Sequence, residues 1–415
     1  MGKVLVWIAA VAAGVWLLLW MGTAVIAHSM AGRDDTAWPL GLGRSSEVLR
    51  RFPSAPASVG AVRLAALARP MGLELTPRAM SAPPDARQQT FAVRGELNQH
   101  VTRQIQRANP VIDPLPETLT AFFKAHDADM ARLRALILSD ELMAWAQDIE
   151  SPSASPIPRL SGHMTLTRVF VARALDLARR EDGAAWEDLR AAWAVNRNLL
   201  ERPEIISVLV GIASARTVNA AARKMPLPAP EWLGELQRFD YRRATLAAHQ
   251  AEAWSMSQRI RDEVSVDEDV NDPASGVARR IRERLLAPYT RLCMLDELER
   301  WRAIAIEIAA ATECDLDLGA VAQRRRAAIP WWNLPARDMP VPNVASMWQR
   351  LLRFRAEIEA TERALDLRAG RPPRRHSACS DGHWEYSAGG LRFSRRLAPP
   401  EIPAAAIPVE FWLTR

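Results

Sequence analysis

The chain has 415 residues, of which 49% are hydrophobic and 25% are charged, and this composition excludes a largely disordered protein. Only three of the 54 basic residues are lysines, and the 48 acidic residues are interspersed among the arginines. The charged residues, whose net charge is +6, therefore form no single-sign block of the kind that binds nucleic acid. We expect no nucleic-acid partner.

The N-terminal segment has the length and polarity of a membrane-spanning helix. Residues 4–27 include no charged residue, and a helix of that length spans about 36 Å against a hydrocarbon core of about 30 Å. Trp7 and Trp20 lie toward its two ends, where indole rings favour the headgroup boundary. We expect residues 1–32 to be a transmembrane anchor, with the lipid bilayer as partner. A signal peptide cleaved after Val25-Ile26-Ala27 is the alternative.

The short head before this segment favours export of the body. Lys3 stands alone on one side, whereas Arg33 and Arg44 follow on the other with two aspartates between them, so the charge bias is small. A head of three residues is typical of a signal-anchor that keeps its amino terminus inside. We predict a single-pass protein of the bacterial inner membrane with a periplasmic body; a cytoplasmic regulator is the other interpretation.

The next segments are predicted to be a linker and an N-terminal helical subdomain. Residues 33–57 are rich in turn formers, with one short helix over residues 45–52. The subdomain covers residues 58–150. Its expected helices are separated by prolines and lie over residues 58–71, 85–108 and 117–149, the last as one or two helices.

The main helical domain is predicted over residues 151–375, after the loop Ser-Pro-Ser-Ala-Ser-Pro-Ile-Pro. Apolar residues at helical spacing predict helices over residues 162–180, 185–201, 204–224, 231–239, 241–263, 276–313 and 343–369. The 276–313 helix is expected to kink or break at Pro288. Residues 330–342 are predicted to be a loop.

One helix pair in this domain resembles a tetratricopeptide repeat. The residues that carry the resemblance are Ala174-Leu175-x-Leu177-Ala178, then Gly183, then Trp186-x-x-Leu189, and they cover about 35 residues. No second copy follows at a fixed period. The resemblance implies a helical protein-binding scaffold.

The tail, residues 376–415, is predicted to be a small β element. Apolar and polar residues alternate on both sides of Ser387-Ala388-Gly389-Gly390, which is the pattern of a β-hairpin. Residues 409–413 are a candidate third strand. The fold class is therefore mainly α: a single N-terminal transmembrane helix, a multi-helix body that resembles a tetratricopeptide repeat in one helix pair, and a C-terminal β-hairpin.

Motifs for catalysis, cofactors and metals are weak or incomplete. The sequence has no G-x-S-x-G, S-x-x-K, H-E-x-x-H or phosphate-loop motif. Residues 267–271 have the first oxygens of a calcium loop, but Asp272 and Ala278 stand where glycine and glutamate are needed. His376, Cys379 and His383 resemble half of a metal site without its other half. We expect no catalytic residue, cofactor or metal.

Two other features are candidates for a role. Three free buried thiols are the default expectation, and a disulfide of Cys379 with Cys293 or Cys314 is the candidate that export of the body would favour. A bond between Cys293 and Cys314 themselves is excluded if one helix holds them about 31 Å apart. Trp331-Trp332, in a proline-rich loop, is a candidate partner-binding or membrane-surface contact.

The predicted function is a membrane-anchored envelope protein whose helical body binds or organises a protein partner. The alternative is an envelope hydrolase that acts on a cell-wall or other polymer with carboxylates that no motif reveals.

Overall fold

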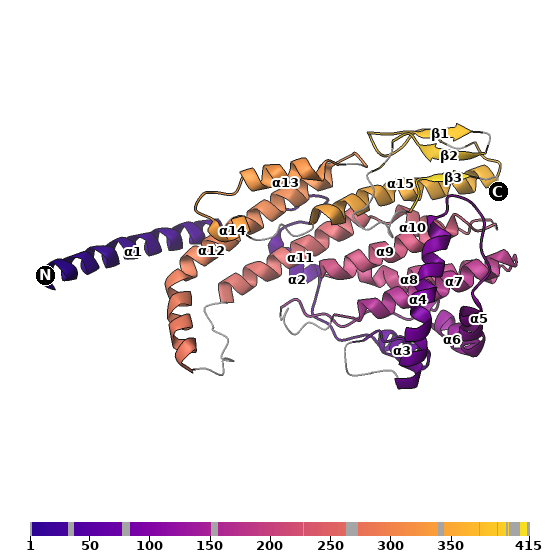
Figure 1. Cartoon of the computed structure of the whole chain (residues 1–415), viewed down its shortest axis with the longest axis horizontal. Helices are drawn as coiled ribbons and strands as arrows, with labels where there is room; N and C mark the ends of the chain where they lie inside the picture. The colour runs from indigo at the N-terminus through magenta and orange to yellow at the C-terminus, as the bar shows by residue number, and fades with distance from the viewer. Residues whose placement is uncertain are drawn as a thin grey trace. The chain divides into compact units, whose positions relative to one another are not determined.

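The computed structural model describes residues 2–31, 37–76, 84–150, 157–226, 228–262, 273–314, 316–338, 344–372, 374–387, 389–395, 397 and 407–412. Within them the chain is mainly helical, with 15 α-helices and one small antiparallel sheet of three strands (Figure 1). The expected helical body and C-terminal hairpin are thereby confirmed. The calcium-like loop at residues 267–271 lies outside the described residues.

The chain forms two compact units. Unit 1 comprises Met1–Arg51, His249–Ala310 and Gly319–Pro342, and unit 2 comprises Phe52–Ala248, Ala311–Leu318 and Asn343–Arg415. The elements of unit 1 are α1 (Gly2–Ala31), α2 (Val48–Arg51), the second part of α11 (Tyr241–Asp262), α12 (Pro273–Ala310), α13 (Leu318–Ala327) and α14 (Leu334–Asp338).

Unit 2 holds most of the helices and the sheet. Its elements are α3 (Val59–Ala68), α4 (Pro84–Gln106), α5 (Glu117–Ala125), α6 (Asp127–Ile137), α7 (Leu160–Arg179), α8 (Ala184–Leu200), α9 (Ile205–Ala222), α10 (Leu233–Arg238), the start of α11, α15 (Val344–Arg368), β1 (Trp384–Ser387), β2 (Gly390–Phe393) and β3 (Glu410–Trp412).

The centre of unit 2 is the run of α7, α8 and α9, which pack on one another in chain order as their apolar spacing predicts. Between α7 and α8 the chain turns at Glu181, whose φ is 58°, and the Asp182 carboxylate accepts a hydrogen bond from the Ala184 amide at 2.9 Å. This side chain satisfies an amide that the first turn of α8 leaves without a partner.

Helix α15 joins this bundle to the sheet. It packs on α9 and also contacts β2 and β3. Ala356, Ala360 and Ala364 recur every fourth residue, so they form one small-residue stripe in a buried cluster with Trp384 and Phe411. Small side chains let the strands lie close to the helix. Figure 1 shows the strands beside α15.

The sheet follows the period of two that its sequence predicts. Trp384 pairs with Phe393 and Tyr386 with Leu391, and Leu391 pairs in turn with Phe411 on β3. Trp384, Leu391 and Phe411 are all buried. The apolar face of the hairpin therefore faces the protein, as its residue pattern requires.

The helix expected to reach residue 149 ends at Ile137, so that part of the prediction is wrong. The following segment is extended, with Met143 and Trp145 buried at a spacing of two and a β-bridge between Gln147 and Ala55. Backbone pairing with the segment before α3 replaces the helical hydrogen bonds. The Ser58 hydroxyl donates to the Leu142 carbonyl at 2.6 Å.

Helix α12 is continuous through Pro288 rather than broken there. Figure 1 shows the helix bent along its length, as the kink alternative predicts.

Among the described residues, one helix is long and apolar enough to cross a membrane, and it is α9. Its mean hydropathy is 1.6, and 72% of it is buried inside the protein. Within α1 the stretch Gly14–Met30 is also apolar, but it is too short to meet the same requirement of length.

Candidate binding pocket beside the disulfide

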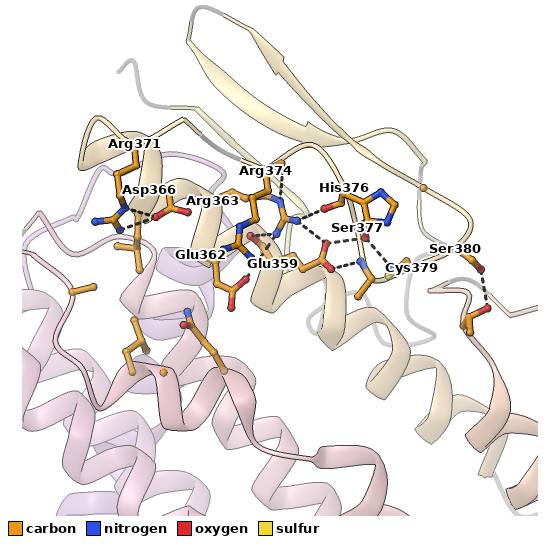
Figure 2. Close-up of a pocket in the computed structure, with 18 of the residues that line it drawn as sticks. Glu359, Glu362, Arg363, Asp366, Arg371, Arg374, His376, Ser377, Cys379 and Ser380 are labelled. Atoms are coloured by element: carbon orange, nitrogen blue, oxygen red, sulfur yellow. Dashed lines mark hydrogen bonds and ion pairs between the residues drawn. The ribbon is translucent and has the colours of Figure 1, made fainter. Parts of the chain in front are cut away.

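A pocket of about 940 Å³ lies in unit 2, between α10, α15 and the loop that precedes β1 (Figure 2). Its volume is in the range of small-molecule sites. The lining residues are Ala229, Pro230, Leu233, Gly234, Gln237, Thr312, Glu359, Glu362, Arg363, Leu365, Asp366, Arg371, Arg374, His376, Ser377, Ala378, Cys379, Ser380 and Gly382. Three carboxylates and three guanidinium groups therefore share one pocket.

The three carboxylates come from one face of α15. Glu359, Glu362 and Asp366 are separated by three and four residues, so a helix of 3.6 residues per turn places them one above another. The spacing is visible in the sequence, yet it is also the pattern of an ordinary solvated helix face. The loop that turns this face into a pocket is not visible in the sequence.

Glu359 holds the loop and the sheet on α15. Its carboxylate accepts hydrogen bonds from the Ser377 hydroxyl at 2.8 Å, the Ala378 amide at 2.6 Å and the buried Trp384 indole at 2.6 Å. With three donors in place, this carboxylate is a structural group and not a free acid or base.

Arg363 completes this attachment. Its guanidinium donates to the carbonyls of Arg374 and His376 and lies 5.1 Å above the Trp384 ring. One planar group thus fixes two loop carbonyls and stacks on an aromatic ring, which a lysine does less well.

Asp366 and Glu362 differ in how much of their charge is compensated. Asp366 forms an ion pair with Arg371 at 2.7 Å. Glu362 is half-exposed, and its ion pair with Arg363 is long, at 3.9 Å. Partial burial raises the pKa of Glu362 above its ordinary value; the neighbouring Glu359 and Asp366 add to this, and Arg363 and Arg374 oppose it. Glu362 is therefore the pocket carboxylate with the weakest protein partner.

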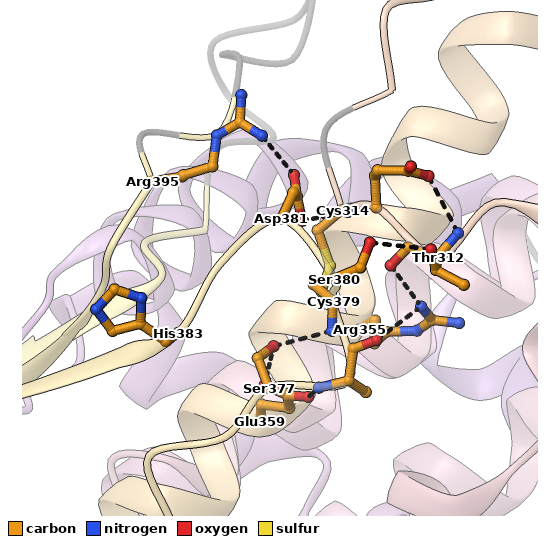
Figure 3. The surroundings of a disulfide bond; sticks show 12 residues. Thr312, Cys314, Arg355, Glu359, Ser377, Cys379, Ser380, Asp381, His383 and Arg395 are labelled. Atoms are coloured by element: carbon orange, nitrogen blue, oxygen red, sulfur yellow. Dashed lines mark hydrogen bonds and ion pairs between the residues drawn. A yellow bond between two sulfur atoms is a disulfide. The ribbon is translucent and has the colours of Figure 1, made fainter.

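The wall of the pocket includes a disulfide between Cys314 and Cys379, whose Cα atoms are 5.3 Å apart (Figure 3). This is one of the two pairings that the sequence allows, and Cys293 is a buried free thiol on α12. Because α12 ends at Ala310, Cys314 lies beyond the helix and meets the tail. Cys379 in a disulfide is no longer a metal-ligating thiolate beside His376 and His383.

Hydrogen bonds around the disulfide fix both of the chain segments that it joins. The Ser380 amide donates to the Thr312 carbonyl at 3.1 Å, and the Cys314 amide donates to the Asp381 carboxylate at 3.0 Å. Asp381 also pairs with Arg395 at 3.1 Å. The pocket wall is thus held by covalent, ionic and backbone contacts.

The tryptophan pair lies in unit 1 and not at this pocket. Trp331 is 80% exposed, whereas Trp332 packs on a small apolar cluster of Ala27, Leu292 and Leu295, with Met30 at its edge. No group of three or more histidine, cysteine or acidic side chains in the described part of the chain is arranged to hold a metal ion.

Comparisons with family models, with curated proteins and with solved structures found no match to this chain. Its function is therefore argued from its own residues.

Proposed function

We propose that this protein is held in a membrane by α1 and carries, outside the cytoplasm, a helical body that binds a protein partner through the pocket between α10 and α15. The observation that carries the anchor is the exposure of α1. Trp7, Leu18 and Val25 are 73%, 67% and 70% exposed, although the helix is apolar. Such an apolar surface needs a cover, and a bilayer covers it along its whole length.

The polar atoms of α1 agree with this placement. The Thr23 hydroxyl donates to the Leu19 carbonyl at 2.9 Å, so it has a partner inside the helix. Helix α9, which is also largely apolar, is a poor candidate to span the membrane, because it is mostly buried and carries Arg216 and Asn219 with protein partners.

The disulfide supports export of the body. Disulfides persist in oxidising compartments and are rare in the bacterial cytoplasm. Its two cysteines both belong to the body, so they report on the side of the membrane where the body folds.

The pocket favours binding over hydrolysis. A polymer hydrolase of the usual type needs two carboxylates that act on the substrate. Here Glu359 is bonded to three protein donors and Asp366 to Arg371, which leaves Glu362. A polar partner segment with a cationic group fits beside Glu362, where the ion pair inside the protein is weakest.

Two measurements test the location. An alkaline phosphatase fused to the C-terminus is expected to be active, and a fluorescent protein that folds only in the cytoplasm is expected to be dark. Alkylation before and after reduction is expected to show two cysteines that become reactive only on reduction. Activity of the cytoplasmic reporter alone would reverse the orientation.

Site-specific photocrosslinking tests the binding site. A photoreactive residue at Gln237, in the pocket wall, is expected to capture the partner in intact cells, and the product should disappear with Glu362→Lys. The control places the same residue at Arg392, on β2 and not in the pocket lining. Equal products at both positions, or a product that survives Glu362→Lys, would contradict the proposal.

A further inference from the structure

Trp331 belongs to a surface that lies at the C-terminal end of α1. Trp332, the next residue, packs on the cluster formed by Ala27, Leu292 and Leu295, and Met30 packs on the same cluster; Ala27 and Met30 belong to the last turns of α1. If α1 crosses the bilayer, these turns lie where the helix leaves it on the side of the body. The tryptophan pair is therefore at the level of the lipid headgroups.

The loop that carries the pair is held firmly to α12. The Tyr289 hydroxyl donates to the Trp332 carbonyl at 2.8 Å. The Asn333 amide group donates to the Cys293 carbonyl at 3.1 Å and to the Asp296 carboxylate at 2.6 Å, and Asn333 is fully buried. These bonds fix the chain at Trp332 and Asn333, directly after Trp331, so the exposure of Trp331 is a consequence of an anchored loop.

Other exposed apolar side chains accompany Trp331 in unit 1. Leu334 is 57% exposed at the start of α14, and Leu285 and Leu286 are exposed on α12 in the turns before Tyr289. A water-soluble surface rarely keeps a tryptophan and several leucines uncovered at neighbouring positions.

The charge next to these side chains is basic. Arg326 at the end of α13 and Arg337 on α14 are exposed, whereas Arg325 is buried against Glu297. Arginines beside a tryptophan are the composition of protein surfaces that contact anionic lipid headgroups. A protein partner has no comparable reason to lie at the end of a membrane helix.

We propose that Trp331, Leu334, Leu285 and Leu286 form a membrane-contact surface that lies in the headgroup region of an anionic bilayer, next to the point where α1 leaves it. This inference rests on the proposed anchor. Its physical role is to restrict the tilt of unit 1 on the membrane, because a second lipid contact beside the helix end removes the freedom of a single tether.

The test uses the full chain in vesicles of phosphatidylethanolamine and phosphatidylglycerol whose acyl chains are brominated near the headgroup. An environment-sensitive fluorophore is placed at Trp331→Cys, in a chain with Cys293→Ala and the disulfide intact. The bromolipids are expected to quench this label strongly, and aqueous iodide to quench it weakly. The matched control is Leu142→Cys, which is 69% exposed in unit 2 and is expected to show the reverse.

A third label, at Leu18→Cys in α1, is measured in the same vesicles with lipids brominated near the ends of the acyl chains, because residue 18 lies in the middle of the segment, and it separates the two proposals. If lipid quenches residue 18 and leaves residue 331 to iodide, the membrane-contact surface is wrong and the anchor stands. If lipid quenches neither, the anchor itself is wrong. If residue 331 is exposed to iodide in vesicles and protected only in native membranes, a protein covers it and the lipid proposal is overturned.

Discussion

Two helices of this chain are largely apolar and have opposite surroundings. Helix α9, in unit 2, has 72% of its length buried among α7, α8 and α15. Helix α1, in unit 1, keeps most of its described large side chains exposed, and it packs on α12 around Ala27. An apolar composition therefore does not predict whether a helix is buried in the protein or exposed. The neighbours of each helix and the polar groups on it do.

The polar groups of α9 are matched to α15. Arg216 donates two hydrogen bonds to the Glu357 carboxylate, at 2.8 and 2.5 Å, and Glu357 is completely buried. Asn219 donates to the Glu357 carbonyl at 3.1 Å, and Arg223 donates to the same carbonyl at 3.0 Å. A bilayer offers no such partners, so α9 is specific for this protein interior.

The largest loss of stability is expected from removing one partner of the ion pair between Arg216 and Glu357. Arg216→Ala leaves the Glu357 carboxylate buried with Arg353 as its remaining cation, at 3.3 Å. Removing one partner of a buried ion pair costs about 3–5 kcal/mol, and the second arginine places the loss near the lower end. Urea unfolding in detergent measures it. Ala213→Ser, at an exposed position of α9, is the control and should change stability little.

A charge in α1 should act on location and not on folding. Leu18→Arg places a guanidinium in the middle of the segment, which costs about 3 kcal/mol for insertion into a bilayer. The fraction of the chain that resists alkaline extraction from membranes is expected to fall, and Leu18→Ala is expected to keep it. Ile212→Arg in α9 is the counterpart: that side chain is 4% exposed, so unit 2 should unfold. The same response at both positions would remove the distinction between the two helices.

A fall in pH should also affect the two helices differently. It should lower the stability of unit 2, which holds α9, because that unit contains a fully buried histidine. Burial, with a smaller contribution from the charge of Arg202, lowers the pKa of His163 from 6.5 to about 3. Between these values the unfolded chain binds the proton and the folded chain does not. Stability is therefore complete above pH 6.5 and is lost as the pH falls toward 3.

The contribution of His163 to this loss is about 2 kcal/mol between pH 7 and pH 5; Asp188, whose pKa burial raises to about 6, acts in the opposite direction. His163→Leu should flatten this dependence, and the membrane fraction of the chain should stay constant over the same range. An unchanged slope in the leucine variant would show that other groups cause the acid response.

The smallest change in stability is expected when alanine replaces one of two glycines. A Cβ at Gly211 of α9 would lie 2.7 Å from Cδ2 of Leu200, whereas a Cβ at Gly22 of α1 would meet nothing within 4 Å. Gly211→Ala is expected to destabilise unit 2 by about 1 kcal/mol, because the overpacking exceeds the gain in helix propensity. Gly22→Ala should be neutral or slightly stabilising. Thermal unfolding of the two variants is sensitive enough to compare them.

The sequence predicts the elements better than it predicts the pocket. The spacing of apolar residues located α7, α8, α9, α15 and the hairpin to within a few residues, because each pattern is local. It failed after Ile137, where pairing with Ala55 overrides the helical pattern. Glu362 has no local pattern that distinguishes it from a solvated residue. Its surroundings come from α10, which is far away in the chain, and from the loop that follows α15.

The pairing of buried charges and of cysteines also depends on residues that are far apart in the chain. Arg216 and Glu357 are 141 residues apart in the chain, so the local sequence around one residue does not indicate that the other is its partner. The choice between Cys293 and Cys314 depends on where α12 ends, and the predicted end at residue 313 kept both possible.

The disulfide also has a topological consequence. It closes a covalent ring of the chain between Cys314 and Cys379, with a sequence separation of 65 residues. The excursion of the chain from unit 2 into unit 1 and back, Gly319–Pro342, lies entirely inside this ring. One proteolytic nick within that excursion therefore leaves both fragments joined, as a single band on a gel until a reductant is added. Under oxidising conditions the C-terminal sheet stays attached to the N-terminal part of the chain even after such a cut.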